Sequence, residues 1–313
     1  MNKPDALNPL VSVIVTTRNE ERNIGNCLRS IQLQTYKPIE MIVVDNNSID
    51  RTQEIARSYT DVVVNKGPER SAQRNFGICE MASGEYAMFI DADMILTPGL
   101  IESCVNEIHK TEIPALHILE LILGRGLLAN IRRFEREFYS GTVIDGARFF
   151  SRSLFCQLGG FDEALLPGPE DWDLDMRIKE IGPIRLLTCR SNSIVWSMAP
   201  FIDERGVRHD PGFNGIYHNE DEQSLRRYLG KKRYYAPSME LYQSKWIASK
   251  SVIRKQLGIK YRLWTVFIEN GKYRKSFSRP VLFALTILLK IAVAARYTAV
   301  VFQKKLTSMS MKD

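Results

Sequence analysis

The first hundred residues alternate between two hydrophobic periods, and this alternation constrains the fold more than any other feature of the chain. Residues 11–17, VSVIVTT, form a short β-branched run of the kind that makes a strand buried on both faces. Asn19 is a candidate cap for the helix that we expect next. The apolar residues of that helix recur at helical spacing: Ile24, Cys27, Leu28 and Ile31.

The same alternation continues along the chain. Further strands are expected at residues 39–44, 61–65 and 86–90. Helices are expected around Ile55, from Ser71 to Met81 and from Pro98 onward. A chain that alternates strand and helix in this way folds as an α/β protein, with a doubly wound, mostly parallel sheet that binds ligands at the carboxyl ends of its strands.

Two acidic residues, Asp91 and Asp93, directly follow the fourth expected strand. An Asp-x-Asp triplet is in itself a common turn sequence, but this one lies where such sheets bind their ligands. Each carboxylate would repel a diphosphate by about 4 kcal/mol per charge pair at 4 Å and intermediate dielectric, and a divalent cation reverses that sign. Oxygen ligands suit Mg²⁺ or Mn²⁺, which would neutralise charge on a departing nucleoside diphosphate.

Asp45 ends the second expected strand and precedes Asn46, Asn47 and Ser48. A carboxylate at this position can accept hydrogen bonds from a nucleoside, as one does in dinucleotide-binding sheets. The alternative is that Asp45 caps the turn that follows it. Both interpretations remain open from the residues alone.

Glu170 and Asp171 open a helix-like stretch after Gly168 and Pro169. One interpretation is that they favour a helix start, where negative charge is stabilising. The other is that one of them is a general base that takes a proton from an acceptor hydroxyl. His218 follows an irregular stretch and could reach back to the sheet as a late metal ligand, although a lone histidine is more often a surface or core residue.

Seven segments, taken in order, resemble the inverting family-2 glycosyltransferases of the GT-A fold. They cover roughly residues 9–222 and read VSVIVTTRNE, IVVDNNSIDRT, ERSAQRNFG, GEYAMFIDADM, LGGFDE, GPEDWDLDMR and YHNED. The resemblance implies a nucleotide pocket lined by Thr16, Arg18 and Glu20. It also implies that Asp45 binds the uridine or guanosine moiety and that Arg74 lies beside the nucleotide's base.

The same resemblance assigns the chemistry. Asp93 would hold the metal, His218 would complete the metal site, and Asp91 would belong to both the donor and the metal sets. Asp171 matches the catalytic base, and Glu170 would position the donor sugar or Asp171. The chain has no Gln-x-x-Arg-Trp motif, which disfavours a processive, polymer-forming synthase.

The resulting hypothesis is a metal-dependent, inverting transfer of a sugar from a UDP- or GDP-linked donor to a hydroxyl of a lipid-linked or other saccharide. A polyisoprenyl-phosphate sugar synthase is the closest alternative, but its phosphate acceptor is already ionised and needs no base. A non-catalytic nucleotide-binding scaffold is an alternative of another class. An Asp-nucleophile phosphatase fits less well, because it expects its Asp-x-Asp after the first strand.

The C-terminal part of the chain is strongly basic. From residue 220 onward it holds 20 Lys and Arg residues against 6 Asp and Glu, whereas residues 1–219 hold 23 against 30. Residues 281–302 contain only two charged residues, Lys290 and Arg296, and each central charge in a membrane span costs about 2.5–3.5 kcal/mol. A helix lying in an anionic membrane interface therefore fits better than a simple span or a nucleic-acid partner. A buried terminal helix is the alternative.

Three further expectations concern organisation and location. Residues 118–131 are strongly apolar and are interpreted as a helix, either in the core or facing a membrane. The five scattered cysteines argue against a disulfide framework and for a reducing compartment, and the N-terminus lacks a signal-peptide pattern. We therefore expect a catalytic domain at residues 1–222, with a nucleotide-binding half (1–110) and an acceptor half (111–222). A basic helical extension at 223–313 would hold it at the cytoplasmic face of the cell membrane.

Overall fold

The computed structural model describes residues 8–187, 201–202, 208–209, 214–221 and 223–310. The chain divides into two compact units. Unit 1 comprises residues 1–121, 145–163 and 170–219, and unit 2 comprises residues 122–144, 164–169 and 220–313. The expected division of function between residues 1–222 and 223–313 stays a prediction.

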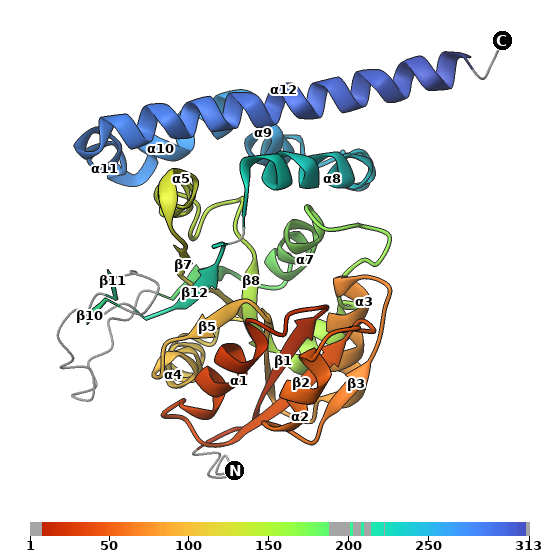
Figure 1. Cartoon of the computed structure of the whole chain (residues 1–313), viewed down its shortest axis with the longest axis vertical. Helices are drawn as coiled ribbons and strands as arrows, with labels where there is room; N and C mark the ends of the chain where they lie inside the picture. Colours follow the sequence, from red (N-terminus) through yellow and green to blue (C-terminus); the bar gives the residue numbers. More distant parts are fainter. Residues whose placement is uncertain (1–7, 188–200, 203–207, 210–213, 222, 311–313) are drawn as a thin grey trace. The chain divides into compact units, whose positions relative to one another are not determined.

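The centre of unit 1 is a seven-stranded sheet with the order β3-β2-β1-β4-β8-β6-β9 (Figure 1). Strands β1 to β4 pair in parallel, and β8 runs antiparallel to both β4 and β6. The predicted mostly parallel, doubly wound sheet is therefore confirmed. Its strands are β1 (Val11–Thr17), β2 (Ile39–Asp45), β3 (Val63–Asn65), β4 (Tyr86–Asp91), β6 (Ala115–His117), β8 (Ala147–Ser151) and β9 (Ile184–Leu186).

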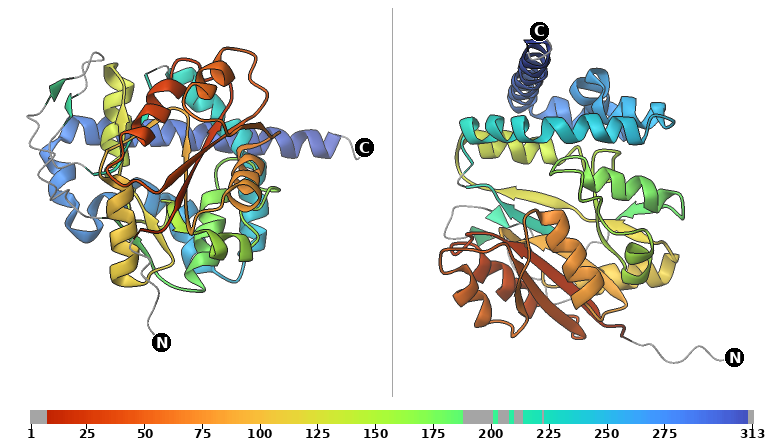
Figure 2. Two further views of the ribbon diagram at one scale, coloured as in Figure 1. Left: turned by 90° about the horizontal axis from the view of Figure 1, so that it is seen from below. Right: turned by 90° about the vertical axis from the view of Figure 1, so that its right-hand side faces the viewer.

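Both faces of this sheet are covered by helices, because alternate residues of each strand point to opposite faces (Figures 1 and 2). Val13 and Val15 belong to the core on one face and Ile14 to the core on the other. The first face packs against α1 (Ile24–Gln32), α2 (Thr52–Arg57) and α4 (Leu100–Thr111). The second packs against α6 (Arg152–Gln157), α7 (Glu170–Lys179) and the π-helical turn η1 (Phe76–Met81), which continues α3 (Arg70–Asn75).

A smaller sheet has the strand order β5-β12-β7, with β5 at Met94–Leu96, β12 at Ile216–Asn219 and β7 at Glu120–Leu123. A separate antiparallel pair joins β10 (Phe201–Ile202) to β11 (Arg208–His209). Strand β7 corrects the expectation of a helix over residues 118–131. Gly124, at positive φ, directly follows the strand, and Gly126, also at positive φ, is the first residue of α5 (Gly126–Arg136).

Unit 2 is helical, which confirms the predicted helical C-terminal extension. Besides α5 it contains α8 (Leu225–Lys245), α9 (Lys250–Leu257), η3 (Tyr261–Thr265), α10 (Val266–Ile268), η4 (Glu269–Gly271), α11 (Tyr273–Ser278) and α12 (Pro280–Ser310). Helix α12 is one continuous helix (Figure 2). Its Leu289 packs with Ile131 of α5 and Tyr228 of α8 in a small core.

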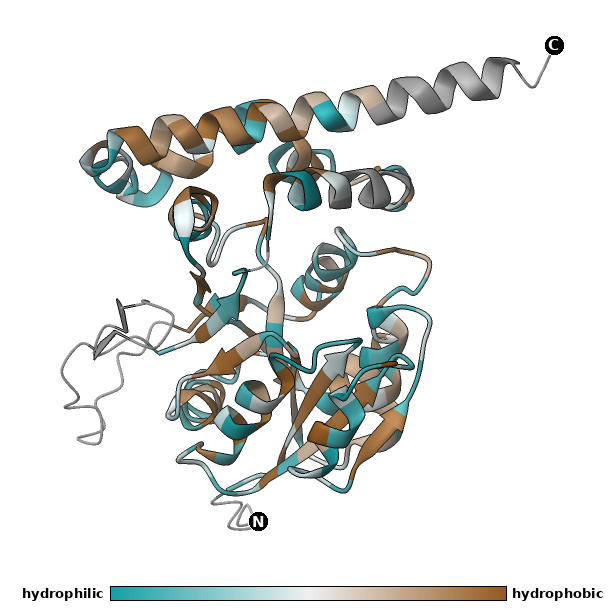
Figure 3. Ribbon diagram, in the orientation of Figure 1, coloured by the Kyte–Doolittle hydropathy of each residue, from teal (hydrophilic) through white to brown (hydrophobic). Residues whose placement is uncertain are grey.

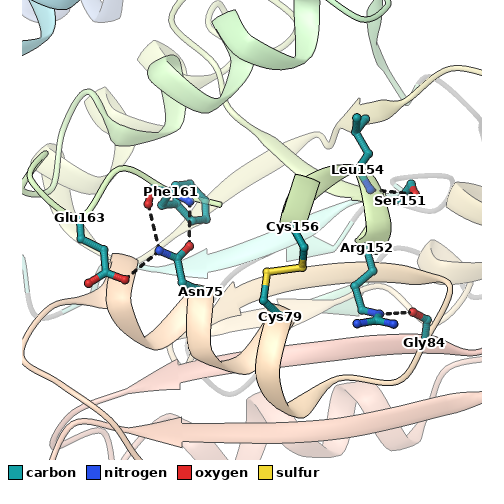
Figure 4. Close-up of a disulfide and its surroundings, with 9 residues drawn as sticks. All are labelled: Asn75, Cys79, Gly84, Ser151, Arg152, Leu154, Cys156, Phe161 and Glu163. Carbon is teal, nitrogen blue, oxygen red and sulfur yellow. Dashed lines mark hydrogen bonds between the residues drawn. A yellow bond between two sulfur atoms is a disulfide. The ribbon is translucent and has the colours of Figure 1, made fainter. Parts of the chain in front are cut away.

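A disulfide joins Cys79 of η1 to Cys156 of α6 (Figure 4). The two residues are 77 positions apart in sequence, but their Cα atoms are 5.7 Å apart, within the range that a disulfide needs. The elements meet because both pack on the same face of the sheet, which cysteine spacing cannot reveal. This bridge corrects the expectation of reduced cysteines and removes their support for a reducing compartment. Cys189 lies outside the described residues.

Candidate functional site

The predicted site lies where β1 and β4 end, at the carboxyl edge of the unit 1 sheet. Parallel register sets Thr16 opposite Asp91, and the Thr16 hydroxyl donates to Asp91 Oδ1 at 3.0 Å. Asp45 ends the neighbouring strand β2 opposite Thr17. Three of the sequence-predicted residues therefore share one edge of one sheet.

Arg74, on α3, connects this edge to α7. Its guanidinium is nearly fully buried and donates to Asp91 Oδ1 at 3.0 Å and to Asp171 Oδ1 at 3.3 Å. The guanidinium carbon lies 4.2 Å from the ring centroid of Phe89, a contact that favours a cation over the ring face. One side chain thus bridges two candidate carboxylates from distant parts of the sequence, and a place for Arg74 beside a nucleotide's base stays a prediction.

Asp91 is ionised in this environment. Burial opposes its charge, but the guanidinium groups of Arg74, Arg70 and Arg148 outweigh burial and hold the pKa of Asp91 well below its usual range. Because the Arg74 guanidinium already neutralises this carboxylate, Asp91 is less suited than Asp93 to be the main ligand of a cation.

Asp93 and His218 form the second part of the site. Strands β5 and β12 pair so that His218 lies opposite Met94, and this brings His218 Nε2 to 3.3 Å from Asp93 Oδ2. The other ring nitrogen, Nδ1, is 2.8 Å from Glu120 Oε1. Burial disfavours a protonated His218, but Asp93 and Glu120 outweigh it and raise the pKa of His218 well above its ordinary value.

These residues fit a divalent cation. Asp93 Oδ1 is buried without a hydrogen-bond partner, and Glu120 would orient His218 as outer carboxylates orient metal-bound imidazoles. Over the part of the chain that the structure describes, no group of three His, Cys, Asp or Glu side chains gathers around one point. Two protein ligands are enough for Mg²⁺, which is commonly bound by one or two side chains together with substrate phosphates.

Glu170 and Asp171 begin α7, as predicted, but their surroundings differ. Glu170 is completely buried and accepts two hydrogen bonds from Arg70, at 2.9 and 3.2 Å. Burial and the neighbouring Asp171 raise the pKa of Glu170, against the opposing effect of Arg70 and Arg74. The Asp171 side chain is 28% exposed. Of the two acids, Asp171 is the one that a substrate can reach.

The sheet fixes the position of α7 through residues that the sequence motifs did not indicate. His117 Nε2 lies 2.7 Å from Asp175 Oδ2, and the backbone N–H of Ala147 donates to Asp175 Oδ1 at 2.9 Å. A Cβ added at Gly146 would lie 2.8 Å from the Cβ of Asp171. Asp175 is one helical turn after Asp171, so the two side chains lie on the same face of α7. This spacing is the feature of the sequence from which a role for Asp175 could have been predicted.

Asp45 has a structural role in the described chain. Its carboxylate accepts hydrogen bonds from the Ser48 backbone N–H at 2.7 Å and from Gln53 Nε2 at 2.8 Å, and its side chain is buried. These bonds shape the turn after β2, as the capping interpretation predicted. A carboxylate has further lone pairs, so binding of a nucleoside by Asp45 stays a prediction.

The loop after β1 carries the remaining predicted donor residues. Arg18 is exposed and lies in a bend with Asn19, and the backbone N–H of Glu20, which follows the bend, donates to Thr52 Oγ1 at 2.7 Å. Asn19 has a φ of 54° and accepts from the Ile49 backbone N–H, so it ties two loops together. It does not cap α1, whose capping position is Asn23.

Three comparisons with known proteins bear on this site. The profile of glycosyl transferase family 2 matches residues 12–118. Glycosyltransferase AglE of Haloferax volcanii is 38% identical over 112 residues, which are 33% of this chain and 36% of that protein. The chain spans about a third of the length of the first curated relatives that it matches.

Two solved structures have a fold similar to that of this chain. A crystal structure of S. aureus TarS 1-349 has a TM-score of 0.52 at 19% identity, covering 93% of this chain and 83% of that chain. A mannosyltransferase from Pyrobaculum calidifontis, in complex with GDP-Man and Mn²⁺, has a TM-score of 0.54 at 18% identity, covering 96% and 81%. The predicted GT-A fold is confirmed by these likenesses.

Proposed function

We propose that this member of glycosyl transferase family 2 transfers a hexosyl group from a UDP- or GDP-sugar to an acceptor hydroxyl, with inversion at the anomeric carbon. The observation that carries the proposal is the bridge through Arg74 from Asp91, at the carboxyl edge of the sheet, to Asp171, at the start of α7. It sets an exposed carboxylate beside the edge where doubly wound sheets bind nucleotides.

The proposed reaction is a single displacement. Asp171 takes the proton of the acceptor hydroxyl while the hydroxyl oxygen attacks the anomeric carbon. The bond from that carbon to the diphosphate oxygen breaks, and the nucleoside diphosphate leaves with the electron pair. Arg74 donates to Asp171, and Gly146 leaves the room that the Asp171 side chain occupies. Glu170, engaged by Arg70, supports the start of the same helix.

Thr16, Arg18, Glu20, Asp45 and Asp91 are proposed to hold the nucleotide part of the donor. Asp93 and His218 would hold Mn²⁺ or Mg²⁺, on the support of the buried, unpartnered Asp93 oxygen and of the solved mannosyltransferase complex with GDP-Man and Mn²⁺. When bound, such an ion neutralises the charge that develops on the departing diphosphate.

We further propose that the acceptor is a lipid-linked saccharide in polysaccharide or glycan assembly, at the cytoplasmic face of the cell membrane. Asp171 as a base favours an acceptor hydroxyl over an acceptor phosphate, because a phosphate is already ionised and would gain nothing from a base. The exposed apolar helix α12 supports the membrane location, and the choice of the cytoplasmic face rests on where nucleotide sugars are made, not on the cysteines.

A donor panel tests the proposal. The purified chain would be incubated with UDP- and GDP-sugars, with Mn²⁺ or Mg²⁺, and with a membrane extract as acceptor source, while nucleoside diphosphate release and labelled product are followed. We expect one donor class to react, and Asp93→Ala and Asp171→Asn each to lower transfer about 100-fold or more, the range of a lost general base. Activity undiminished in both variants would identify a non-catalytic site instead.

Acceptor classes separate the hydroxyl transferase from its closest alternative. Bare polyprenyl phosphate and a lipid-linked saccharide would be compared as acceptors for the native chain and for Asp171→Asn. Transfer to the bare phosphate that Asp171→Asn does not slow would overturn the proposed role of Asp171 and indicate a polyisoprenyl-phosphate sugar synthase.

A further inference from the structure

Lys290, near the middle of the apolar stretch 280–299 of α12, points into unit 2. Its side chain is 9% exposed and its Nζ lies 3.1 Å from Glu135 Oε1 on α5, with the Tyr139 hydroxyl as a further partner. Burial opposes ionisation of Glu135, but Lys290 and Arg132 outweigh it and hold the pKa of Glu135 well below its usual range, whereas burial lowers the pKa of Lys290 in spite of Glu135. The charge that most opposes membrane insertion of α12 is therefore compensated within unit 2.

The opposite side of α12 is apolar and uncovered. Val281, Leu288 and Ile291 are 70%, 61% and 49% exposed, while Leu289, one residue from Leu288, lies in the core against α5 and α8. Residues 280–299 are long and apolar enough to cross a membrane by length and composition, and the part of α12 that Figure 3 colours is predominantly hydrophobic. Val281, Leu288 and Ile291 therefore form an exposed apolar ridge on α12, on the side away from its contacts with α5 and α8.

Two large aromatic side chains are exposed beside the start of α12, next to Phe283 on its packed side. Trp264 of η3 and Phe277 of α11 are 50% and 60% exposed. Each ring lies 6.4 Å from the ring of Phe283, centroid to centroid. Trp264, Phe277, Val281, Leu288 and Ile291 together are called the α12 surface below. Aromatic residues are enriched at the headgroup level of membranes because their rings suit the interface.

Basic residues border the α12 surface. Exposed cations precede α12 or lie on it: Lys260, Arg274 and Arg296, and also Lys275 and Arg279, which both pair with Glu137. A protein partner would need a surface that is both acidic and apolar and that matches this one in shape. An anionic bilayer offers negative headgroups and an apolar interior without any need for a matching shape. The combination of charge and apolar exposure therefore indicates a lipid surface as the occupant.

We propose that the α12 surface docks unit 2 on an anionic membrane, with α12 lying parallel to the bilayer and not crossing it. A crossing helix would have to separate Lys290 from Glu135 or take both into hydrocarbon, and would carry Arg296 with it. A helix lying in the interface keeps the Lys290–Glu135 pair intact and leaves Arg296 at headgroup level.

Vesicle flotation of the full chain tests this docking. We compare vesicles of phosphatidylcholine alone with vesicles that also contain phosphatidylglycerol, at low and high salt. The expected result is binding to the anionic vesicles, weakened by salt and released by alkaline carbonate. The variant Trp264→Ala/Phe277→Ala/Leu288→Ser should bind at least tenfold more weakly. The matched control is Ile181→Ser, which removes an equally exposed apolar side chain from unit 1 and should bind as the native chain does.

Four results would overturn the proposal: no binding to anionic vesicles, equal binding by the triple variant, resistance to carbonate extraction, or self-association through the α12 surface without vesicle binding. The last would identify a second copy of the chain as the occupant. Donor hydrolysis measured without membranes keeps the two proposals distinguishable, because the triple variant should hydrolyse donor at the native rate whichever way docking turns out.

Discussion

At the scale of single residues, Arg74 is the centre of the site, because its guanidinium holds two carboxylates that come from different elements. Arg74→Lys keeps the charge but loses the planar fork, so it cannot donate to both Asp91 and Asp171. We expect kcat to fall about 100-fold, the effect of a misplaced catalytic group. Steady-state kinetics would show this, with exposed Arg29→Lys as the control; a kcat for Arg74→Lys equal to the control's would refute the bridge.

Gly146 is the second positioning residue. An added Cβ would lie 2.8 Å from the Cβ of Asp171, a distance at which one of the two must move. Gly146→Ala should therefore lower kcat about 100-fold while nucleotide affinity, measured by calorimetry, stays near the native value. Gly230→Ala is the control, because a Cβ at Gly230 meets nothing within 4 Å. Equal kcat values for the two variants would show that Gly146 does not affect the position of Asp171.

His117 gives unit 1 a defined pH dependence. Burial disfavours its charge, but Asp175 and Asp145 outweigh burial and raise the pKa of His117. A raised folded pKa means that the stabilisation is complete below the unfolded value of about 6.5 and is lost as pH rises through the folded pKa. Urea unfolding should show stability falling above about pH 6.5 in the native chain and a flatter profile in His117→Gln. Parallel profiles would contradict the assignment.

The positions of several site residues could be predicted from the sequence, but their pairing with other side chains could not. Asp91, Asp93 and Asp171 could be found because strand ends and helix starts place them without knowledge of neighbours. The pairing of Asp91 with Arg74 and of His117 with Asp175 depends on which strands are adjacent and how deeply each side chain is buried. Neither follows from a single sequence.

At the scale of secondary-structure elements, α12 is held to α5 by the buried pair of Lys290 and Glu135. Glu135→Gln leaves Lys290 buried without its carboxylate, which should cost about 3–5 kcal/mol. Hydrogen exchange of the α12 amides should then accelerate, and Glu135→Gln/Lys290→Met should restore much of the protection. If the single and double variants exchange alike, the ion pair does not hold the helix.

Elements with a clear period were predicted well and the others were not. The strands β1, β2 and β4 follow from continuous apolar runs, and the helix α1 follows from the helical spacing of its buried apolar residues. Residues 118–131 were misassigned, because Leu and Ile side chains suit a buried helix and a strand equally and only the backbone at Gly124 decides. The Cys79–Cys156 bridge was missed, because it depends on η1 and α6 sharing a face of the sheet.

At the scale of the whole molecule, unit 1 carries every residue assigned to donor, metal and base, and unit 2 carries the α12 surface. The two proposals are therefore separable by experiment, with catalysis tested in solution and docking tested on vesicles. This division also explains the charge asymmetry of the chain, since the basic residues gather after position 220, where a lipid partner is proposed.

The most direct test of the central claim is the anomeric configuration of the transferred sugar, determined by nuclear magnetic resonance on the product of the native chain. A single displacement assisted by Asp171 predicts a product whose configuration is opposite to that of the donor. A product with the donor's own configuration would contradict the account, because it requires either a covalent intermediate or attack from the face that the diphosphate leaves.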